Sequence, residues 1–336
     1  MTAKLKEIIA QAIYIDRDMI PPTPCIQIQG RTVATPGNFI TINGLPKHYK
    51  STIMQFFIAS ALTGIPYHGI QLEPVQDKNI CIIDTEQGVY DFHKQQYRLK
   101  NLISETKTPE NLKCYLFRRY DPQVILQAIE SILTDDKPKY LFIDNLTELV
   151  INANDIEESK KVVQLLKKWT DTFDTTIINL LHLGRSNLNT LGHLGAFADR
   201  AAQSALKVSV DKNTEIVTLE PSLMRSDKWF SNIHIQYDED TRQWYPAEVV
   251  KKETTSKKFN IEELSGGEHY NRLDAIFKGN PLKYSELTEL VRQYYGIGAN
   301  IAKQKVIPYL LQYKYILQLD RGIYSLNYKH NERTTI

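Results

Sequence analysis

The chain has 336 residues, of which 42% are hydrophobic and 24% are charged, and its formal net charge is +2. This length suits one large or two moderate domains, and the absence of an apolar run near 18 residues argues against a membrane-spanning helix. Three scattered cysteines (Cys25, Cys81 and Cys114) show no metal-ligand spacing and cannot all pair, so we expect a reduced, cytoplasmic setting.

The N-terminal part precedes the first clear strand. The stretch MTAKLKEIIAQAIYI predicts a short amphipathic helix rather than a signal peptide, because charges interrupt it and no small-residue cleavage site follows. Residues 22–37 are punctuated by proline and glycine. We therefore assign residues 1–37 to a helix and strap.

Strand and helix patterns then alternate along the chain. Strands are predicted at 38–45, 78–87, 112–120, 137–150 and 175–183, and helices at 51–64, 91–103, 122–135 and 157–173. A loop, the segment 204–222 and a hairpin around 229–246 follow. Strands alternating with helices predict βαβ units around a mostly parallel sheet, so the fold class is α/β with a core over 38–250.

The last part of the chain has a different pattern. The polar, basic run KKETTSKK lies in a predicted linker over 251–268, and three helical patterns follow, the second at 285–296 and the third at 298–313. The pair YILQL and IYSLN, joined by Asp-Arg-Gly, predicts a hairpin. This order is typical of a winged-helix domain, which we assign to 269–330.

One loop nearly matches the phosphate-binding pattern G-x-x-x-x-G-K-[ST]. It lies between a predicted strand and a predicted helix, where backbone N–H groups and the helix dipole converge on an anion. Tyr49 replaces the second glycine, and we expect ordinary backbone angles there. Lys50 would reach the β- and γ-phosphates of a nucleotide, Ser51 would bind Mg²⁺, and Lys47 adds charge. The residues assigned to the cofactor are Gly44, Leu45, Pro46, Lys47, His48, Tyr49, Lys50, Ser51 and Thr52.

Polar residues follow three further buried strands. Asp144 ends YLFID and would hold the Mg²⁺ shell, Asp84 and Glu86 end the strand CIID and its turn, and His182 ends TIINLLH. Ligand groups in open α/β sheets gather beyond such carboxyl ends, so these residues are expected beside the loop.

With these motifs, the sequence resembles the RecA-like P-loop ATPases, and among them the RepA/DnaB-type hexameric helicases and the RadA-type recombinases, over roughly residues 38–250. The resemblance implies that Glu86 activates water and that His182 senses the γ-phosphate. It also implies that Arg225 and Lys228 reach the nucleotide of a neighbouring subunit. The loop form G-x-P-K-x-x-K-[ST] looks like one found in ATPases of bacterial mobile elements or plasmids.

DNA contacts are expected in two places. The stretch 184–198, with Arg185 and His193, resembles a loop that faces single-stranded DNA in a central pore. Residues 270–336 carry a local charge of +5, and Lys303, Lys305 and Arg321 of the winged helix would contact duplex DNA. Bland alternatives remain for each: a core histidine at 182, a solvated strand edge at 225–228 and a plain connection at 184–198.

Three functions are compatible with this pattern. The first is an ATP-hydrolysing, Mg²⁺-dependent DNA motor of the helicase type, assembled as a ring or filament. The second is an ATP-switched adaptor that binds DNA or a protein without unwinding. The third is a small-molecule kinase, for which no substrate-pocket motif is recognisable.

Overall fold

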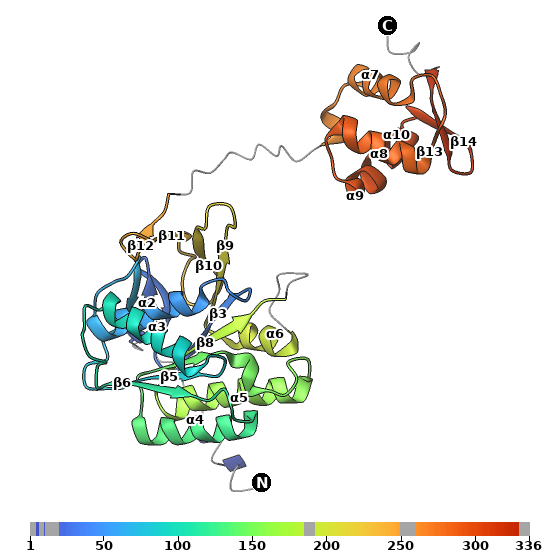
Figure 1. Cartoon of the computed structure of the whole chain (residues 1–336). Helices are drawn as coiled ribbons and strands as arrows, with labels where there is room; N and C mark the ends of the chain where they lie inside the picture. The colour runs from blue at the N-terminus through green and yellow to red at the C-terminus, as the bar shows by residue number, and fades with distance from the viewer. Residues whose placement is uncertain (1–4, 7–9, 11–19, 185–191, 249–259, 329–336) are drawn as a thin grey trace. The chain divides into compact units, whose positions relative to one another are not determined.

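The structure, a computed structural model, describes residues 5–6, 10, 20–184, 192–248 and 260–328. The chain divides into two compact units, Met1–Val249 and Val250–Ile336 (Figure 1). The described part of the second unit begins at Asn260, so it takes in residues that the sequence analysis assigns to the linker. Each unit has its own hydrophobic core.

The first unit is built on a nine-stranded sheet with the order β12-β11-β10-β9-β3-β8-β7-β5-β6. Six neighbouring strands, from β9 to β6, are parallel, and the three at the other end are antiparallel. In sheet order the strands are β12 (Gln243–Pro246), β11 (Ile233–Asp238), β10 (Val217–Met224), β9 (Ser204–Val210), β3 (Phe39–Gly44), β8 (Thr176–His182), β7 (Tyr140–Asp144), β5 (Ile80–Asp84) and β6 (Leu112–Leu116).

Helices cover both faces of this sheet (Figure 1). One face packs against α2 (Lys50–Thr63), α3 (Val89–Leu102) and a small sheet of β2 (Arg31–Ala34), β1 (Ile26–Ile28) and β4 (Ile70–Leu72). The other face packs against α4 (Pro122–Asp136), η1 (Leu146–Leu149), α5 (Ile156–Thr172) and α6 (Gly192–Ala201).

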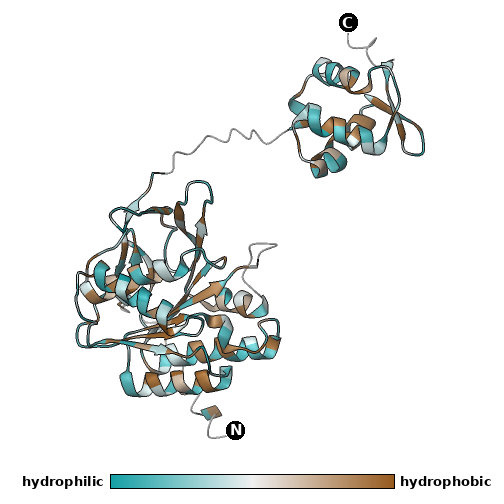
Figure 2. Ribbon diagram, in the orientation of Figure 1, coloured by the Kyte–Doolittle hydropathy of each residue, from teal (hydrophilic) through white to brown (hydrophobic). Residues whose placement is uncertain are grey.

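The apolar runs of the central strands explain this layering. In β5, Ile80 and Ile82 belong to one core, whereas Cys81 and Ile83 belong to the other, because successive side chains point to opposite faces. A strand buried on both faces is apolar at every position, and Figure 2 shows the central strands mostly in the hydrophobic colour. The predicted α/β class with a mostly parallel sheet is confirmed.

Two parts of the first unit differ from the sequence analysis. Residues 192–198, expected within a loop, lie in α6, and the expected strap contains β1 and β2. Helix α6 is held to β3 by Asp199, whose Oδ1 accepts hydrogen bonds from Thr41 Oγ1 (2.7 Å) and Asn43 Nδ2 (2.9 Å). Strand β1 pairs with β4, more than 40 residues away. Both features depend on contacts that are distant in sequence.

The second unit combines helices with a small three-stranded sheet of order β13-β15-β14. Its core joins residues of the helices and of β14 and β15. In chain order its elements are η2 (Ile261–Glu263), α7 (Gly266–Phe277), β13 (Leu282–Lys283), α8 (Tyr284–Tyr295), α9 (Ala299–Ile301), the π-helical segment η3 (Ala302–Val306), α10 (Ile307–Gln312), β14 (Ile316–Asp320) and β15 (Ile323–Leu326). Within the described parts of both units, no helix is long and apolar enough to cross a membrane.

Candidate nucleotide site

The register of the parallel strands brings the predicted site residues to one edge. Gly44 at the end of β3 lies beside His182 at the end of β8, and Asp84 of β5 lies beside Asp144 of β7. The turn 45–49 connects this edge to α2, which begins at Lys50. The loop and the three other strand ends therefore surround one place in the fold.

Close packing explains the first glycine of the loop. A Cβ on Gly44 would lie 2.8 Å from the carbonyl oxygen of Val208 and 3.1 Å from Cγ of Lys50. Within the turn, the N–H of His48 donates to the carbonyl of Leu45 (3.3 Å), and Lys47 is exposed with a φ of 64°. Pro46 is also exposed, and Thr52 is half-buried in the first turn of α2.

Tyr49 does not have the ordinary backbone angles expected from the sequence. Its φ is 58° and its ψ is 23°, the left-handed conformation that a glycine adopts most readily. The side chain is 45% exposed, and its ring lies edge-on against Trp244 of β12, with 5.2 Å between centroids. The loop thus keeps a glycine-like backbone at this position, and the ring is stabilised outside the turn.

The ammonium of Lys50 is fully engaged. Lys50 is only 6% exposed, and its Nζ lies within hydrogen-bond distance of the Gly44 carbonyl (3.1 Å), the Leu45 carbonyl (3.0 Å) and Nδ1 of His182 (3.1 Å). Burial lowers the pKa of Lys50, while Asp144 and Glu86 oppose that shift. Since an ammonium has three N–H groups, a phosphate can bind Lys50 only by displacing one of these acceptors.

Ser51 and Asp144 form the candidate metal position. Ser51 Oγ donates to Asp144 Oδ2 at 2.6 Å, and Asp144 is 4% exposed. Burial raises the pKa of Asp144 to about 7, and the carboxylates of Asp84 and Glu86 add to the rise. A buried carboxylate paired with a hydroxyl fits Mg²⁺, which takes one or two protein ligands and completes its shell with phosphate oxygens and water. Among the described residues, no group of three His, Cys, Asp or Glu side chains could hold a metal.

Glu86 is joined to Lys50 through His182. His182 Nε2 lies 2.8 Å from Glu86 Oε1, and Nδ1 of the same ring faces Lys50. Because Lys50 can only donate, Nδ1 accepts and the ring proton sits on Nε2, from which it is donated to Glu86. The bond to His182 lowers the pKa of Glu86, burial opposes this, and the bond to Asn145 lowers it further. Glu86 is therefore a carboxylate at neutral pH.

Three polar residues near Glu86 escaped the sequence analysis or had another role there. Asp84, buried, accepts from the N–H groups of Glu86 (3.0 Å) and Gln87 (2.7 Å), so it shapes the turn that carries Glu86. Thr85 Oγ1 accepts from the N–H of Asn145 (2.9 Å), and Asn145 Nδ2 donates to Glu86 Oε1 (2.9 Å). A polar residue directly after the strand YLFID was the one available signal for Asn145.

The predicted finger residues lie at the other edge of the sheet. Met224 of β10 is paired with Ser204, which starts β9, so Arg225 lies at the amino ends of the parallel strands. The Arg225 guanidinium donates to the carbonyl of Arg200, and the N–H of Lys228 donates to Asp227 (2.6 Å). Neither residue is brought to the phosphate loop of its own chain.

The predicted DNA contacts are dispersed. Arg185 lies outside the described residues, and His193 lies in α6, stacked on Phe197 with 5.9 Å between ring centroids. Lys303 and Lys305 are exposed on η3 of the second unit, and Arg321 is exposed in the turn between β14 and β15.

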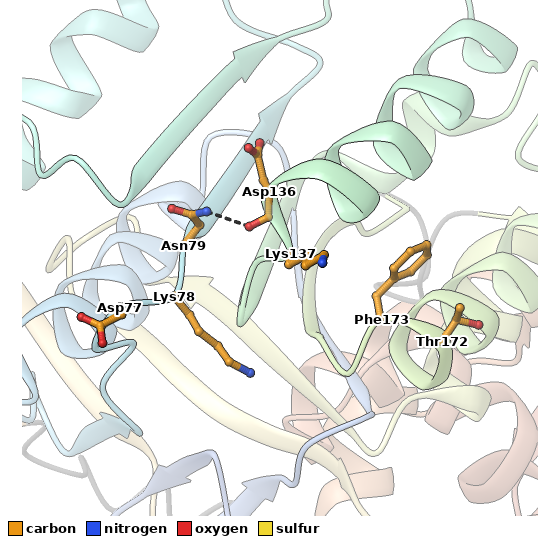
Figure 3. A pocket seen from close by; sticks show the side chains of 7 residues that line it. All are labelled: Asp77, Lys78, Asn79, Asp136, Lys137, Thr172 and Phe173. Carbon is orange, nitrogen blue, oxygen red and sulfur yellow. Dashed lines mark hydrogen bonds between the residues drawn. The ribbon is translucent and has the colours of Figure 1, made fainter.

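A pocket of about 460 Å³ lies away from this site (Figure 3). It is formed at the amino end of β5 and the carboxyl ends of α4 and α5, by Asp77, Lys78, Asn79, Asp136, Lys137, Thr172 and Phe173. Because β5 points its carboxyl end toward the phosphate loop, this pocket is at the opposite edge and belongs to no step discussed below.

Comparisons with known proteins add little to this geometry. No protein-family model matches the chain, and no curated protein matches it. One solved structure to which it is similar is the ATPase domain of a DnaB-like helicase, at a TM-score of 0.46 and 14% sequence identity, over 66% of this chain and 88% of that chain. At these values the likeness carries nothing about the site, whose chemistry follows from its own residues.

Proposed function

We propose that the first unit is a RecA-like ATPase that binds ATP with Mg²⁺ at residues 44–52 and hydrolyses it. One observation carries this proposal. Lys50, the Ser51–Asp144 pair and the His182–Glu86 pair converge at the carboxyl ends of four parallel strands, beside a loop with a left-handed residue at its turn. These are a phosphate cation, a metal position, and a base with a partner that can sense phosphate.

The residues have separate tasks in this reaction. Lys50 and the N–H groups of the loop bind the β- and γ-phosphates, and Ser51 and Asp144 would hold Mg²⁺, which neutralises charge on the phosphate oxygens. The carboxylate of Glu86 takes a proton from water as the water oxygen bonds to the γ-phosphorus. The bond between that phosphorus and the β–γ bridging oxygen breaks, so the products are ADP and inorganic phosphate.

Two substitutions test the assignment. Lys50→Ala should abolish ATP binding measured by calorimetry, because it removes the buried ammonium beside the loop. Glu86→Gln should bind ATP normally and lose turnover, since an amide keeps the shape but cannot take the proton. Unchanged affinity in the first variant, or turnover within about threefold of wild type in the second, would contradict the site.

We further propose that ATP turnover drives a helicase-type DNA motor, in the replication or transfer of a plasmid or mobile element. In such an assembly Arg225 and Lys228 would complete the site of a neighbouring copy, Arg225 because it lies far from its own loop. The stretch with Arg185 and His193 would face single-stranded DNA. The second unit, with three helical stretches followed by a hairpin, would act as a winged helix that contacts duplex DNA through Lys303, Lys305 and Arg321.

The DNA part of the proposal has its own test. Cutting the chain after Val250 should leave ATP hydrolysis and weaken DNA binding, because residues 270–336 carry a local charge of +5. The slope of log affinity against log salt should fall by roughly 0.7–0.9 for each DNA phosphate that the shortened chain no longer neutralises. An unchanged slope would mean that the second unit does not bind DNA.

A second function is favoured by one feature of the site. Lys50 and Glu86 are both held by His182, and Tyr49 stands where the second glycine is usual, so slow turnover is expected. An ATP-switched adaptor would need only binding and a conformational response. A strand-displacement assay separates the two functions: unwinding supports the motor, and nucleotide-dependent DNA or protein binding without unwinding supports the adaptor.

A further inference from the structure

Asn145 is held in one orientation by three hydrogen bonds. It is fully buried directly after Asp144, its N–H donates to Thr85 Oγ1 (2.9 Å), and its Oδ1 accepts from the N–H of Thr147 (3.1 Å) at the start of η1. The remaining group, Nδ2, donates to Glu86 Oε1 at 2.9 Å. The orientation of the amide is therefore fixed by the turn after β7, and Glu86 receives a donor that cannot swing away.

The Glu86 carboxylate is held by one oxygen only. Both Asn145 Nδ2 and His182 Nε2 reach Oε1, at 2.9 Å and 2.8 Å. Within the described part of the chain, no hydrogen bond to Oε2 is present. Oε1 thus serves as the anchor, and Oε2 is available to accept a proton.

The two anchors differ in what phosphate binding does to them. His182 shares its other nitrogen with Lys50, whose three N–H groups are all in use, so a phosphate that takes one of them competes with His182. Of the three acceptors, His182 is the one side chain, and it can rotate. Asn145 has no bond to Lys50, so it holds Glu86 whether or not His182 stays.

We propose that Asn145 is the positioning residue of Glu86: it fixes Oε1 throughout the reaction and directs Oε2 toward the attacking water. This inference rests on the proposed ATPase function. Asn145 touches neither substrate nor metal in this role and acts only through Glu86. A 1 Å displacement of a reacting group can cost on the order of a hundredfold in rate, so one positioning bond is enough to matter.

Asn145→Ser tests the proposal in the full-length protein. A serine hydroxyl can still accept from the N–H of Thr147, but it is too short to reach Glu86. We expect kcat for ATP to fall by between about tenfold and a hundredfold, while KM stays within about twofold. Asn145→Asp is the second variant, since its carboxylate keeps the acceptor for Thr147 and cannot donate to Glu86. The matched control is Asn79→Ser, which removes an amide that donates to the Asp136 carbonyl (2.7 Å) at the opposite edge, and should leave kcat unchanged.

A double variant separates positioning from general damage. Glu86→Gln with Asn145→Ser should turn over no more slowly than Glu86→Gln alone, because no base is left to position. Unchanged kcat in both Asn145 variants, or a loss that is multiplied in the double variant, would overturn the proposal. If the wild type hydrolyses no ATP, the ATPase function itself fails, and that result is distinct because it appears before any substitution at Asn145.

Discussion

At the scale of single residues, Tyr49 shows how a sequence can depart from a motif and keep its backbone. A left-handed conformation costs a non-glycine residue about 1–2 kcal/mol, and an aromatic pair returns about 0.5–1.5 kcal/mol. The contact between Tyr49 and Trp244 therefore offsets much of the strain at the loop. The second glycine of the motif is replaceable here because β12 supplies a partner for the ring.

This balance predicts the order of stability among variants at position 49. Tyr49→Gly loses the ring contact and the strain together, so the free energy of unfolding of the first unit should change little. Tyr49→Ala loses the ring and keeps the strain, and should be about 1–2 kcal/mol less stable than the glycine variant in denaturant melts. Equal stability of the two variants would mean that position 49 is not held in the left-handed region. The glycine variant should hydrolyse ATP at least as fast as wild type.

At the scale of elements, the long apolar strands were predictable and the short or glycine-rich elements were not. Strands β3, β5, β7 and β8 are continuous apolar runs, and each was predicted near its observed place. Strands β1, β2 and β4 have three or four residues each and exist because they pair with one another. No local pattern specifies such pairing.

The same limit applies to the candidate site. Lys50, Ser51, Asp144, Glu86 and His182 could be selected because each follows an apolar strand or lies in the loop. The bond from Lys50 to His182 could not, since it depends on the parallel register of β3 and β8. Asn145 was missed because a polar residue after a strand end is common, and its contact to Glu86 needs the pairing of β5 with β7.

Helix α6 provides a prediction at this scale. Two glycines in GHLGAFADRA weaken the helical pattern, so the bonds from Thr41 and Asn43 to Asp199 help hold the helix to β3. Asp199→Ala leaves these buried donors without that acceptor and should lower the free energy of unfolding by about 1–3 kcal/mol. Asp171→Ala, at an exposed position of α5, is the control and should cost less than about 0.5 kcal/mol. Equal losses would show that Asp199 does not hold α6.

At the scale of the whole molecule, two separate cores mean two stabilities that respond to different conditions. The second unit contains a fully buried histidine, His269, within a cage of the Tyr295, Tyr309 and Tyr315 rings. His269 Nε2 lies 3.2 Å from the Ile261 carbonyl, and Nδ1 lies 3.1 Å from the Tyr295 hydroxyl. A neutral ring satisfies both contacts, as donor and acceptor respectively.

The pH dependence of the second unit follows from this histidine. Burial lowers the pKa of His269 below 6.5, the neighbouring Arg272 adds to this, and the Ile261 carbonyl and Glu268 oppose it. Below pH 6.5 the unfolded chain binds a proton that the folded unit does not, so stability falls as the pH falls toward the folded-state pKa. The slope cannot exceed about 1.4 kcal/mol per pH unit for one site.

Hydrogen exchange in the full chain can measure this effect. Protection of α7, corrected for intrinsic exchange, should decrease between pH 7 and pH 5.5. The dependence should be weaker in His269→Gln, whose side chain does not titrate. The pH is kept above 5 because the pKa of Glu268 is also shifted, downward from 4.5 by bonds from Ser265, and its contribution belongs to a more acidic window. A pH-independent wild type would contradict the role of His269.

The ring contact at the phosphate loop has an optical consequence. The first unit holds three tryptophans, of which Trp169 is fully buried, Trp229 is exposed, and Trp244 touches the loop through Tyr49. The indole of Trp244 also lies 5.2 Å from the ring of Tyr237, so its surroundings are well defined. Because Tyr49 directly precedes Lys50, any shift of the loop when an anion enters alters the environment of this indole. Native emission from Trp244 thus gives a label-free signal of loop movement, which Trp244→Phe would remove while leaving an aromatic ring against Tyr49.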